Sequence, residues 1–248
     1  MNIVVCISSV PDTTAKINFV NNGNTFDSSA VQFVINPYDE FGLTKAMKIK
    51  EESSGKVIII TVGDISVEPV MRKALAIGAD EAVRINMTAK DSYSTAAEIA
   101  NYISNNSADL IITGKESSDY NGGAVGGMVA EMLNLPFINS CNGLDISGDS
   151  AKITREIDGG KETITSDLPL VIGGQKGLVE ESELRIPNMR GIMQARTKPL
   201  SVIEPMKNEI LTSSISFEKP AEKGACKLVE ADNVSYLVAM LQNEAKVI

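Results

Sequence analysis

Short apolar runs and helical patterns alternate through the first half of this 248-residue chain, and this alternation restricts the possible folds most strongly. Runs suited to buried strands span residues 2–7, 56–62, 81–85 and 109–113. Helical patterns follow them, beginning near residues 37, 66, 92 and 122. Such a repeat of strand and helix is typical of a parallel sheet that helices cover on both faces.

The second half of the chain has a different pattern. Two β-rich segments, 152–156 and 162–166, flank the turn sequence IDGGK and predict a hairpin, and 168–172 predicts another buried strand. The segment after residue 199 has one amphipathic pattern near 233–243 and too little apolar sequence for its own core. We predict an α/β fold with a doubly wound, mostly parallel Rossmann-like sheet, added β-hairpin strands and a C-terminal arm. The expected units are a body at 1–199 and an arm at 200–248.

The composition excludes several kinds of chemistry. The chain has no histidine, which rules out Ser-His-Asp and Cys-His nucleophile systems and His-ligated zinc or haem. Its three cysteines, Cys6, Cys141 and Cys226, lie far apart and form no CxxC, so a disulfide framework or a zinc cluster is disfavoured. The net charge of −9 argues against a nucleic-acid binder, which needs a basic face. We predict neither a catalytic residue nor a metal site.

The apolar runs are too short to cross a bilayer. The run at 57–62 is far below the ~20 residues that a membrane-spanning helix needs. The first residues, MNIVVCISSVPDT, lack the basic start and long apolar stretch of a secretory signal. We therefore expect a cytoplasmic protein without direct membrane insertion.

Small residues follow the fourth predicted strand. The segment 119–127, DYNGGAVGG, runs into a helix that is predicted to begin at about Gly122. Free backbone N–H groups and the positive end of a helix dipole suit a phosphate at such a place. The same glycines are equally compatible with a tight turn that lets the helix pack closely on its strand. The spacing fits neither GxxxxGK[ST] nor GxGxxG, which weakens a P-loop NTPase and a standard dinucleotide dehydrogenase.

Two other segments have both a structural and a functional interpretation. The sequence NPYD at 36–39 is typical of a helix start, and its main chain and Asn36 would also approach a nucleotide bound at neighbouring loops. The segment 184–198, LRIPNMRGIMQARTK, has several basic residues and no acid inside an acidic protein. It is either an amphipathic turn over its own core or a docking surface with apolar anchors.

Five blocks of sequence together carry a family resemblance. They are VVCISSVPDT, INPYDEFGL, GKESSDYNGGAVGGMVAEMLNLP, REIDGGKET and LRIPNMRGIMQARTK, in that order along the chain. Over nearly its whole length the chain resembles the beta subunits of electron-transfer flavoproteins. The resemblance implies a heterodimer whose alpha subunit carries the redox-active FAD, while this chain is a nucleotide-holding scaffold that holds AMP or, in electron-bifurcating members, a second FAD. It also implies electron donors among flavin dehydrogenases, such as acyl-CoA dehydrogenases, and a membrane quinone reductase as acceptor.

The resemblance also assigns residues to two sites. Nucleotide contacts fall on Cys6, Asn36, Pro37, Tyr38, Asp39, Val62, Asp119, Asn121, Gly122, Gly123, Ala124, Val125, Gly126, Gly127, Met128 and Ala130. The loop that docks the dehydrogenase falls on Arg185, Ile186, Pro187, Met189, Arg190, Ile192 and Met193, with Met189 as the apolar anchor. The C-terminal arm is expected to pack on the alpha subunit.

Departures from the family pattern leave the subtype open. Ser8 stands where the family often has Lys, and the stretch at 123–126 with Ala130 and Glu131 is similar to bifurcating members. The block REIDGGKET is instead similar to non-bifurcating members, and we favour AMP. A stand-alone adenine-nucleotide-binding protein of the universal-stress type shares the Rossmann-like half, but it gives no role to the 184–198 loop or the arm. An NAD-dependent oxidoreductase lacks its dinucleotide fingerprint here.

Overall fold

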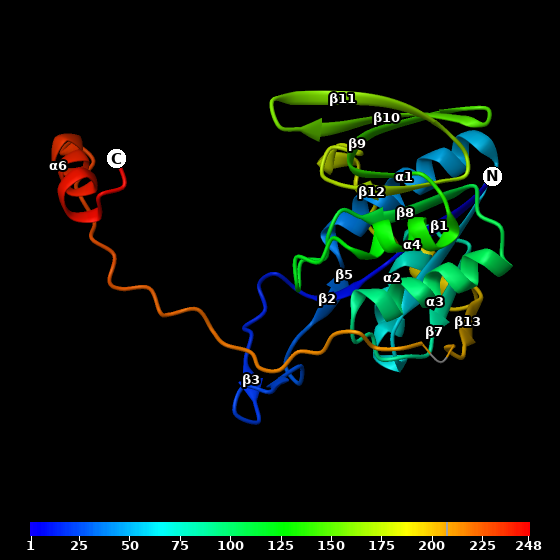
Figure 1. Cartoon of the computed structure of the whole chain (residues 1–248), viewed down its shortest axis with the longest axis horizontal. Coiled ribbons are helices and arrows are strands. Elements are labelled where there is room, and N and C mark those ends of the chain that lie inside the picture. The colour runs from blue at the N-terminus through cyan, green and yellow to red at the C-terminus, as the bar shows by residue number, and fades with distance from the viewer. Residues whose placement is uncertain (207) are drawn as a thin grey trace.

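A large central sheet organises the computed structural model, which describes residues 1–206 and 208–248. The described strands of this sheet have the order β11-β10-β9-β12-β8-β1-β6-β7-β13 (Figure 1). Their bounds are β1 Asn2–Cys6, β6 Lys56–Val62, β7 Glu81–Ile85, β8 Leu110–Gly114, β9 Phe137–Ser147, β10 Ser150–Ile157, β11 Gly160–Asp167, β12 Leu170–Gly174 and β13 Leu200–Ile203. In the part of the sheet that runs β9-β12-β8-β1-β6-β7-β13, every neighbouring pair of strands is parallel. Strand β10 pairs antiparallel with both β9 and β11. The predicted α/β class, the parallel sheet and the added hairpin are confirmed.

Helices cover both faces of the sheet, as a doubly wound fold requires. They are α1 Pro37–Ser53, α2 Glu68–Ile77, α3 Ser92–Asn105 and α4 Val125–Leu133. Successive residues of β1 point to opposite faces, so Ile3 and Val5 join the cluster packed by α1 and α2. Val4 and Cys6 join the cluster packed by α3 and α4 on the other face.

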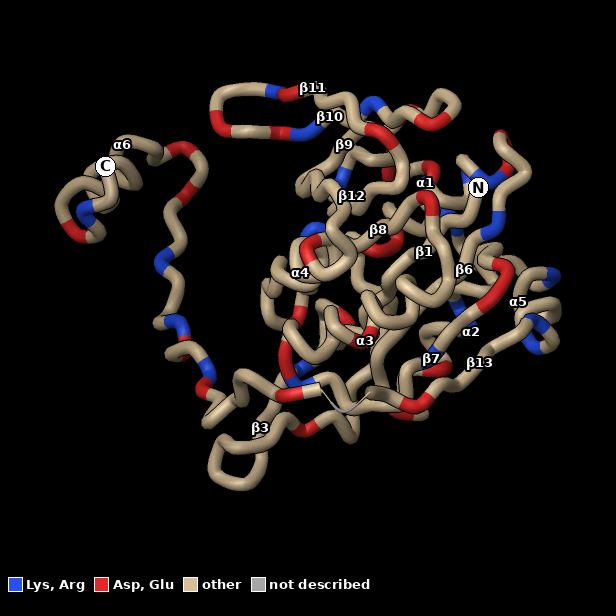
Figure 2. Tube along the Cα trace, turned by 45° about the vertical axis from the view of Figure 1, so that its right-hand side comes forward, with Lys and Arg blue, Asp and Glu red and all other residues tan. Residues whose placement is uncertain are grey.

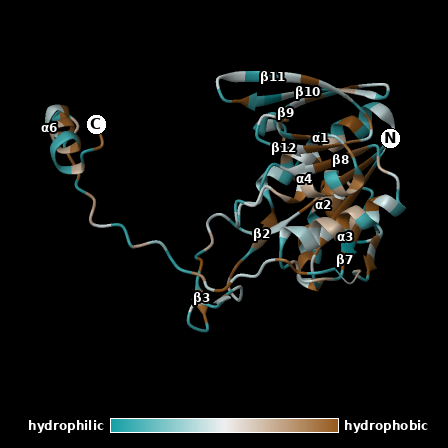
Figure 3. Ribbon diagram, in the orientation of Figure 1, coloured by the Kyte–Doolittle hydropathy of each residue, from teal (hydrophilic) through white to brown (hydrophobic). Residues whose placement is uncertain are grey.

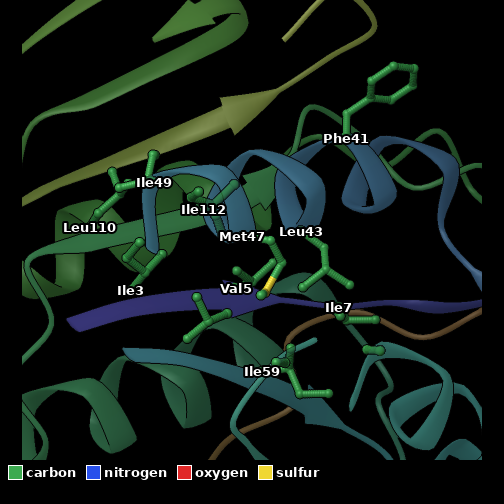
Figure 4. Close-up of a cluster of buried hydrophobic side chains, with 14 of the residues drawn as sticks. Ile3, Val5, Ile7, Phe41, Leu43, Met47, Ile49, Ile59, Leu110 and Ile112 are labelled. Atoms are coloured by element: carbon green, nitrogen blue, oxygen red, sulfur yellow. The ribbon is translucent and has the colours of Figure 1, made fainter. Parts of the chain in front are cut away.

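The first of these two cores is the larger. Met47 of α1 lies over Val5 of the sheet, and Leu110 lies beside Ile3 and Ile49 toward the other end of the cluster (Figure 4). Each buried Leu, Ile or Val contributes about 1.5–3 kcal/mol relative to an exposed one. The two cores therefore fix the ends of the central strands rigidly, and those ends are where a doubly wound fold binds ligands.

The starts of two helices differ from the predictions. Helix α2 begins at Glu68 rather than at residue 66, because a 3₁₀ turn, η1 (Ile65–Val67), precedes it. The side chain of Asp64 caps that turn by accepting from the Ser66 N–H at 2.8 Å. Helix α4 begins at Val125 rather than at Gly122. The delay has a local cause, because Asn121 is left-handed and Ser117 bridges to Gly122, which closes a loop before the helix starts.

The long strand β9 was not predicted. Its buried residues Ile138, Cys141 and Leu144 are three apart, because extra residues interrupt its pairing with β12 and β10. Ser140 lies at one of these bulges with φ +58°. Beyond β9, the β10–β11 hairpin turns at Gly159, which has φ +86°, and it is far more polar than the central strands (Figure 3).

Two small antiparallel ribbons interrupt the connection from β1 to α1. β2 (Ser9–Pro11) pairs with β5 (Phe33–Ile35), and β3 (Phe19–Val20) pairs with β4 (Thr25–Phe26). No helix among residues 1–206 and 208–248 is long and apolar enough to cross a membrane.

The C-terminal segment begins inside the sheet. β13 pairs parallel with β7, so the sheet extends four residues past the expected boundary at residue 199. The chain then passes α3 and reaches the β3–β4 ribbon, where Phe217 stacks on Phe19 with ring centroids 5.1 Å apart. Beyond this contact an extended arm leads away to α6 (Val234–Met240) and a π-helical turn, η3 (Leu241–Ala245) (Figure 1).

Candidate functional site

The carboxyl ends of β8, β1 and β6 lie side by side at one edge of the sheet. From β1 the chain proceeds to β6 and β7 on one side, and it then returns to β8 on the other side of β1. This reversal between β1 and β8 is the kind of switch point at which doubly wound sheets bind ligands. Cys6 ends β1 and is 8% exposed, and Val62 ends β6.

The amino end of α4 opens onto this switch point. Ala124 is the N-cap, and the N–H groups of Val125, Gly126 and Gly127 precede the first turn's hydrogen bonds. Unpaired N–H groups and the helix dipole together attract an anion such as a phosphate. The loop that leads in, residues 119–124, is exposed.

The glycines at this helix start have different tasks. A Cβ on Gly126 would lie 2.6 Å from Thr113 Oγ1 and 3.0 Å from the Phe137 ring, so Gly126 permits close packing of α4 on β8 and β9. A Cβ on Gly122 would meet nothing closer than Ser117 Oγ at 3.6 Å. The packing interpretation therefore applies to Gly126, and packing does not require a glycine at position 122.

A doubly wound fold binds its ligand in the space beyond the strand ends at the switch point, here between the loops after β1 and β8, and we call this space the crevice. Two of the predicted contact residues lie beneath it. Asn36 is 1% exposed and Asp39 is 2% exposed, and their side chains bond to each other, with Asn36 Nδ2 donating to Asp39 Oδ1 at 3.0 Å. Asn36 Oδ1 also accepts from the Ser118 N–H at 3.2 Å. These side chains support the loops of the crevice from below.

One polar atom of the crevice has no partner. The Ser118 hydroxyl oxygen is buried without a hydrogen-bond partner, although its own N–H is held by Asn36. A buried hydroxyl left unpaired is costly, so a ligand group at this place would be stabilised by it. The orphaned hydroxyl, the free helix N–H groups and the open Gly122 fit the phosphate or ribose of a nucleotide. Ser118 was not among the predicted contacts, although it lies in the GKESSDYNGGAVGGMVAEMLNLP block that carries the family resemblance.

The remaining predicted contacts are divided between crevice and core. Pro37 is in the first turn of α1, and the neighbouring Tyr38 is half-buried, where burial and the Glu116 carboxylate raise its pKa. Asp119 and Asn121 are on the exposed loop, as are Gly123 and Ala124. Met128 and Ala130 pack instead against the core between α3 and the sheet.

The 184–198 segment forms a second exposed feature, far along the chain from the crevice loops. Its helix α5 (Met189–Ala195) is capped by the Asn188 side chain, which accepts from the Gly191 N–H at 2.8 Å. Met189 is 75% exposed and Met193 one turn later is 69% exposed. Ile186 is 84% exposed and Ile192 is 42% exposed, so four apolar side chains of this segment reach solvent.

A groove runs between α5 and α2. It has a volume of about 520 Å³ and is lined by Pro69, Arg72, Lys73, Ala76, Pro187, Ile192, Ala195 and Arg196. Basic residues gather around α5, although the chain as a whole is acidic (Figure 2). Arg185 is not among the free cations, because its guanidinium donates to both carboxylate oxygens of Glu51 on α1, at 2.8 and 2.6 Å.

Comparison with known proteins assigns the chain to a family. Residues 23–208 match the family described as "Electron transfer flavoprotein domain". The chain is 35% identical over 262 aligned residues to the "Electron transfer flavoprotein subunit beta" of Bacillus subtilis (strain 168), and the alignment covers 100% of both chains. The chain belongs to the electron transfer flavoprotein beta-subunit family.

Other relatives in this beta-subunit family come from distant organisms. A protein of the same description from Syntrophomonas wolfei is 31% identical over 252 residues, which is 100% of this chain and 98% of that protein. One from Dictyostelium discoideum is 31% identical over 241 residues, covering 94% and 95% of the two chains. The resemblance inferred from the five sequence blocks is confirmed, and it displaces the interpretations as a universal-stress type protein or an NAD-dependent oxidoreductase.

The thiols of this beta-subunit family member are separate from one another. Cys6, Cys141 and Cys226 are all free; the first two are buried and the third is exposed on the arm. Burial raises the pKa of Cys141 to about 12, and burial together with the Asp39 carboxylate raises that of Cys6 further. Both buried groups are therefore neutral thiols at physiological pH, which makes them poor nucleophiles.

Proposed function

We propose that this chain is the nucleotide-holding subunit of a heterodimeric electron carrier. The partner is an alpha subunit that holds the redox-active FAD, and this chain binds AMP in the crevice between β1 and β8. When bound to the alpha subunit, FAD supplies the electron-transfer chemistry. The residues of this chain bind and orient a nucleotide and present a docking surface, and none of them is proposed to be catalytic.

The observation that supports nucleotide binding most directly is the amino end of α4. Its free N–H groups at Val125, Gly126 and Gly127 point to the switch point, and no bulky side chain at residues 122–124 precedes them. The unpartnered Ser118 hydroxyl adds a polar group that a bound ligand would satisfy. The acidic loop residue Asp119 is exposed and would remain free to contact hydroxyl groups of a ribose.

We further propose that the 184–198 loop docks flavin dehydrogenases, such as an acyl-CoA dehydrogenase, with Met189 as its anchor. The exposed Met189, Met193 and Ile186 support this role, since a docking surface needs a few apolar anchors within a polar rim. Electrons would then leave toward a quinone reductase or a similar acceptor.

The arm is the proposed contact with the alpha subunit. Residues of α6 such as Val234 and Tyr236 are 61% and 53% exposed, and this helix buries none of its residues against its own chain. Helix α6 therefore needs a partner to bury its apolar side chains.

The identity of the nucleotide can be measured directly. The purified heterodimer is denatured, and the AMP and FAD released per dimer are counted by chromatography. One FAD and one AMP are expected. Two FAD and no AMP would replace this proposal with the electron-bifurcating subtype, which the sequence at 123–126 resembles. One FAD and no second nucleotide would refute nucleotide binding by this chain.

A further inference from the structure

A buried polar pair joins the loops of the crevice from below. Asp39 accepts three N–H groups: one from Ser8 at 2.7 Å, one from the Asn36 side chain at 3.0 Å and one from the backbone of Gly114. Ser8 follows β1, and Gly114 ends β8. One carboxylate thus holds together the two strand ends that form the switch point.

Asn36 extends this connection to the loop before α4. Its Nδ2 atom donates to the Glu116 carbonyl at 2.9 Å as well as to Asp39, and its Oδ1 atom accepts from the Ser118 N–H at 3.2 Å. Its backbone N–H donates to the Ser8 carbonyl at 3.0 Å. Every polar atom of the Asn36 side chain is therefore used to hold loop backbone or Asp39.

The site of Asp39 is unfavourable for a charge. Gly114 is required beside it, because a Cβ there would overlap Asp39 Oδ1. The titratable groups that face the carboxylate are the neutral thiol of Cys6 and the carboxylate of Asp119 on the loop after β8. Burial, with a smaller contribution from Asp119, raises the pKa of Asp39 to about 7.

We propose that Asp39 is a positioning residue whose ionised carboxylate holds the loops after β1 and β8 in the arrangement that binds the nucleotide. This inference rests on the proposed nucleotide site and adds to it a residue that does not touch the ligand. The carboxylate suits its position because it only accepts hydrogen bonds, and three N–H donors face it. An amide or a protonated carboxyl would direct a donor at one of those N–H groups and break that bond.

The pH dependence follows from the same geometry. The pKa of Asp39 in the folded chain, about 7, is above the ordinary value of 3.8, so the folded chain without ligand is favoured by protonation and loses stability as the pH rises toward 7. Nucleotide affinity has the opposite dependence, because only the ionised form holds all three donors. A substitution of Asp39 therefore separates affinity from stability, which a purely structural residue would not do.

The experiment uses the nucleotide-depleted heterodimer and AMP as the probe. AMP affinity is measured by calorimetry at several values between about pH 6 and 8.5, and thermal unfolding is followed without nucleotide. The variants are Asp39→Asn and, should that protein fail to assemble, Asn36→Leu. Glu98→Gln is the matched control, because Glu98 is equally buried at 2% exposure and its carboxylate accepts from Met206 N and Asn208 Nδ2, away from the crevice.

Asp39→Asn is expected to weaken AMP binding at least about tenfold near pH 8, because a hydrogen bond to a charged group is lost. Its unfolding midpoint should stay close to that of the wild type, since the amide avoids the desolvation of a charge. Wild-type affinity should fall as the pH drops through about 7, and the variant should show only the titration of the phosphate itself near 6. Asn36→Leu is expected to weaken binding similarly, and Glu98→Gln to leave affinity unchanged.

Two results would overturn the proposal. One is wild-type affinity in Asp39→Asn with an unchanged pH profile. The other is a loss of affinity that follows a matching loss of thermal stability, or that Glu98→Gln reproduces. Failure of the proposed function gives a different result, because the wild-type heterodimer would then bind neither AMP nor FAD at this chain at any pH.

Discussion

Arg72 of α2 and Lys198 after α5 each stabilise the carboxyl end of the other's helix. Arg72 Nη1 donates to the carbonyls of Ala195 and Lys198, at 2.7 and 2.9 Å, and Lys198 Nζ donates to those of Leu75 and Ala79, at 3.0 and 2.6 Å. Cations at helix carboxyl ends satisfy carbonyls that have no partner within the helix. This reciprocal contact fixes the 184–198 loop to the body of the fold, although the loop itself has few buried side chains.

Arg72→Met is expected to loosen this attachment. The variant keeps the apolar stem but leaves the Ala195 and Lys198 carbonyls without their donor, so we expect the free energy of unfolding to fall by about 1–3 kcal/mol. Urea denaturation measures that change. Lys176→Met is the control, because Lys176 pairs with Glu181 on the exposed surface and such pairs contribute little. Equal stability of Arg72→Met and wild type would show that α5 is held by its packing on α2 alone.

Two glycines of the crevice should respond differently to substitution. Gly122→Asp has room for its side chain but places a carboxylate and extra bulk beside the proposed phosphate position, so nucleotide content should fall while the nucleotide-free fold stays intact. Gly126→Ala should instead destabilise the fold by about 1–3 kcal/mol, because its Cβ meets Thr113 and Phe137. Released nucleotide and thermal unfolding are measured for both variants.

Gly160→Asp is the matched control for Gly122→Asp. Gly160 starts β11 in the distant hairpin, and a Cβ there would meet nothing within 4 Å. It should retain the nucleotide. Full retention in Gly122→Asp as well would place the phosphate away from this loop.

The central strands could be predicted because each buried strand corresponds to a short, mostly apolar run in the sequence. The 56–62 and 81–85 runs became β6 and β7 without a change of bounds, since most residues of each run are apolar and both strands are buried on both faces. Strand β9 was not predicted, because the extra residue of a bulge changes which side chains face the core and interrupts the alternating pattern of a strand. Strand β13 was missed because the partner of an edge strand is decided by tertiary contacts.

The candidate site could be predicted only in part. The segment 119–127 stood out through its small residues, but its helix begins later because of the Ser117–Gly122 bridge, which no local pattern predicts. The contacts predicted at Asn36 and Asp39 stay predictions, whereas the supporting bonds of their buried side chains were not predicted; these bonds reach Ser8 and residues beyond 113, far along the chain. Such long-range bonds have no signature in a single sequence.

Asp91 holds the start of the C-terminal segment as well as a helix start. Its Oδ1 atom accepts from the Ser94 N–H at 2.8 Å as the cap of α3, and its Oδ2 atom accepts from the N–H groups of Leu211 and Thr212, at 2.7 and 3.0 Å. Asp91→Asn should therefore keep the cap and lose the second contact, whereas Asp91→Ala should lose both.

Hydrogen exchange distinguishes these two substitutions of Asp91. Amides of Leu211 and Thr212 should exchange faster in both variants, and that of Ser94 only in Asp91→Ala. The Ser94 and backbone hydrogen bonds lower the pKa of Asp91 to about 2, below its ordinary 3.8. The ionised group thus stabilises the wild-type fold above about pH 4, and this stabilisation is lost as the pH falls toward 2. Unchanged exchange at Leu211 in Asp91→Asn would contradict the assignment.

The cysteines are expected to have no part in electron transfer. Replacing Cys6, Cys141 and Cys226 together by Ala should leave the rate of electron transfer intact, because the three free thiols lie apart and two are buried and neutral. Some loss of stability is expected from the cavities left at the two buried positions. The rate is measured in the assembled heterodimer with its cofactors. A folded, fully loaded triple variant that transfers no electrons would refute the scaffold function.

Substitutions of Met189 and Arg185 should distinguish a loss of dehydrogenase docking from a loss of loop structure. Met189→Ala removes an exposed anchor, so coupling to the dehydrogenase should weaken by about tenfold to hundredfold, from the ~1.5–3 kcal/mol that a buried Met contributes. Arg185→Met should weaken docking indirectly, because it removes the ion pair with Glu51 that holds the loop on α1. Arg190→Met should mainly slow the encounter with the dehydrogenase, and this effect should fade as the salt concentration rises. The measurement is dehydrogenase-dependent reduction of the flavoprotein at several partner concentrations, with nucleotide content, flavin content and heterodimer stability as controls. Because Met189 makes little contact with its own chain, those controls should match wild type. If Met189→Ala reacts like wild type, or if it instead dissociates from the alpha subunit, the loop is structural.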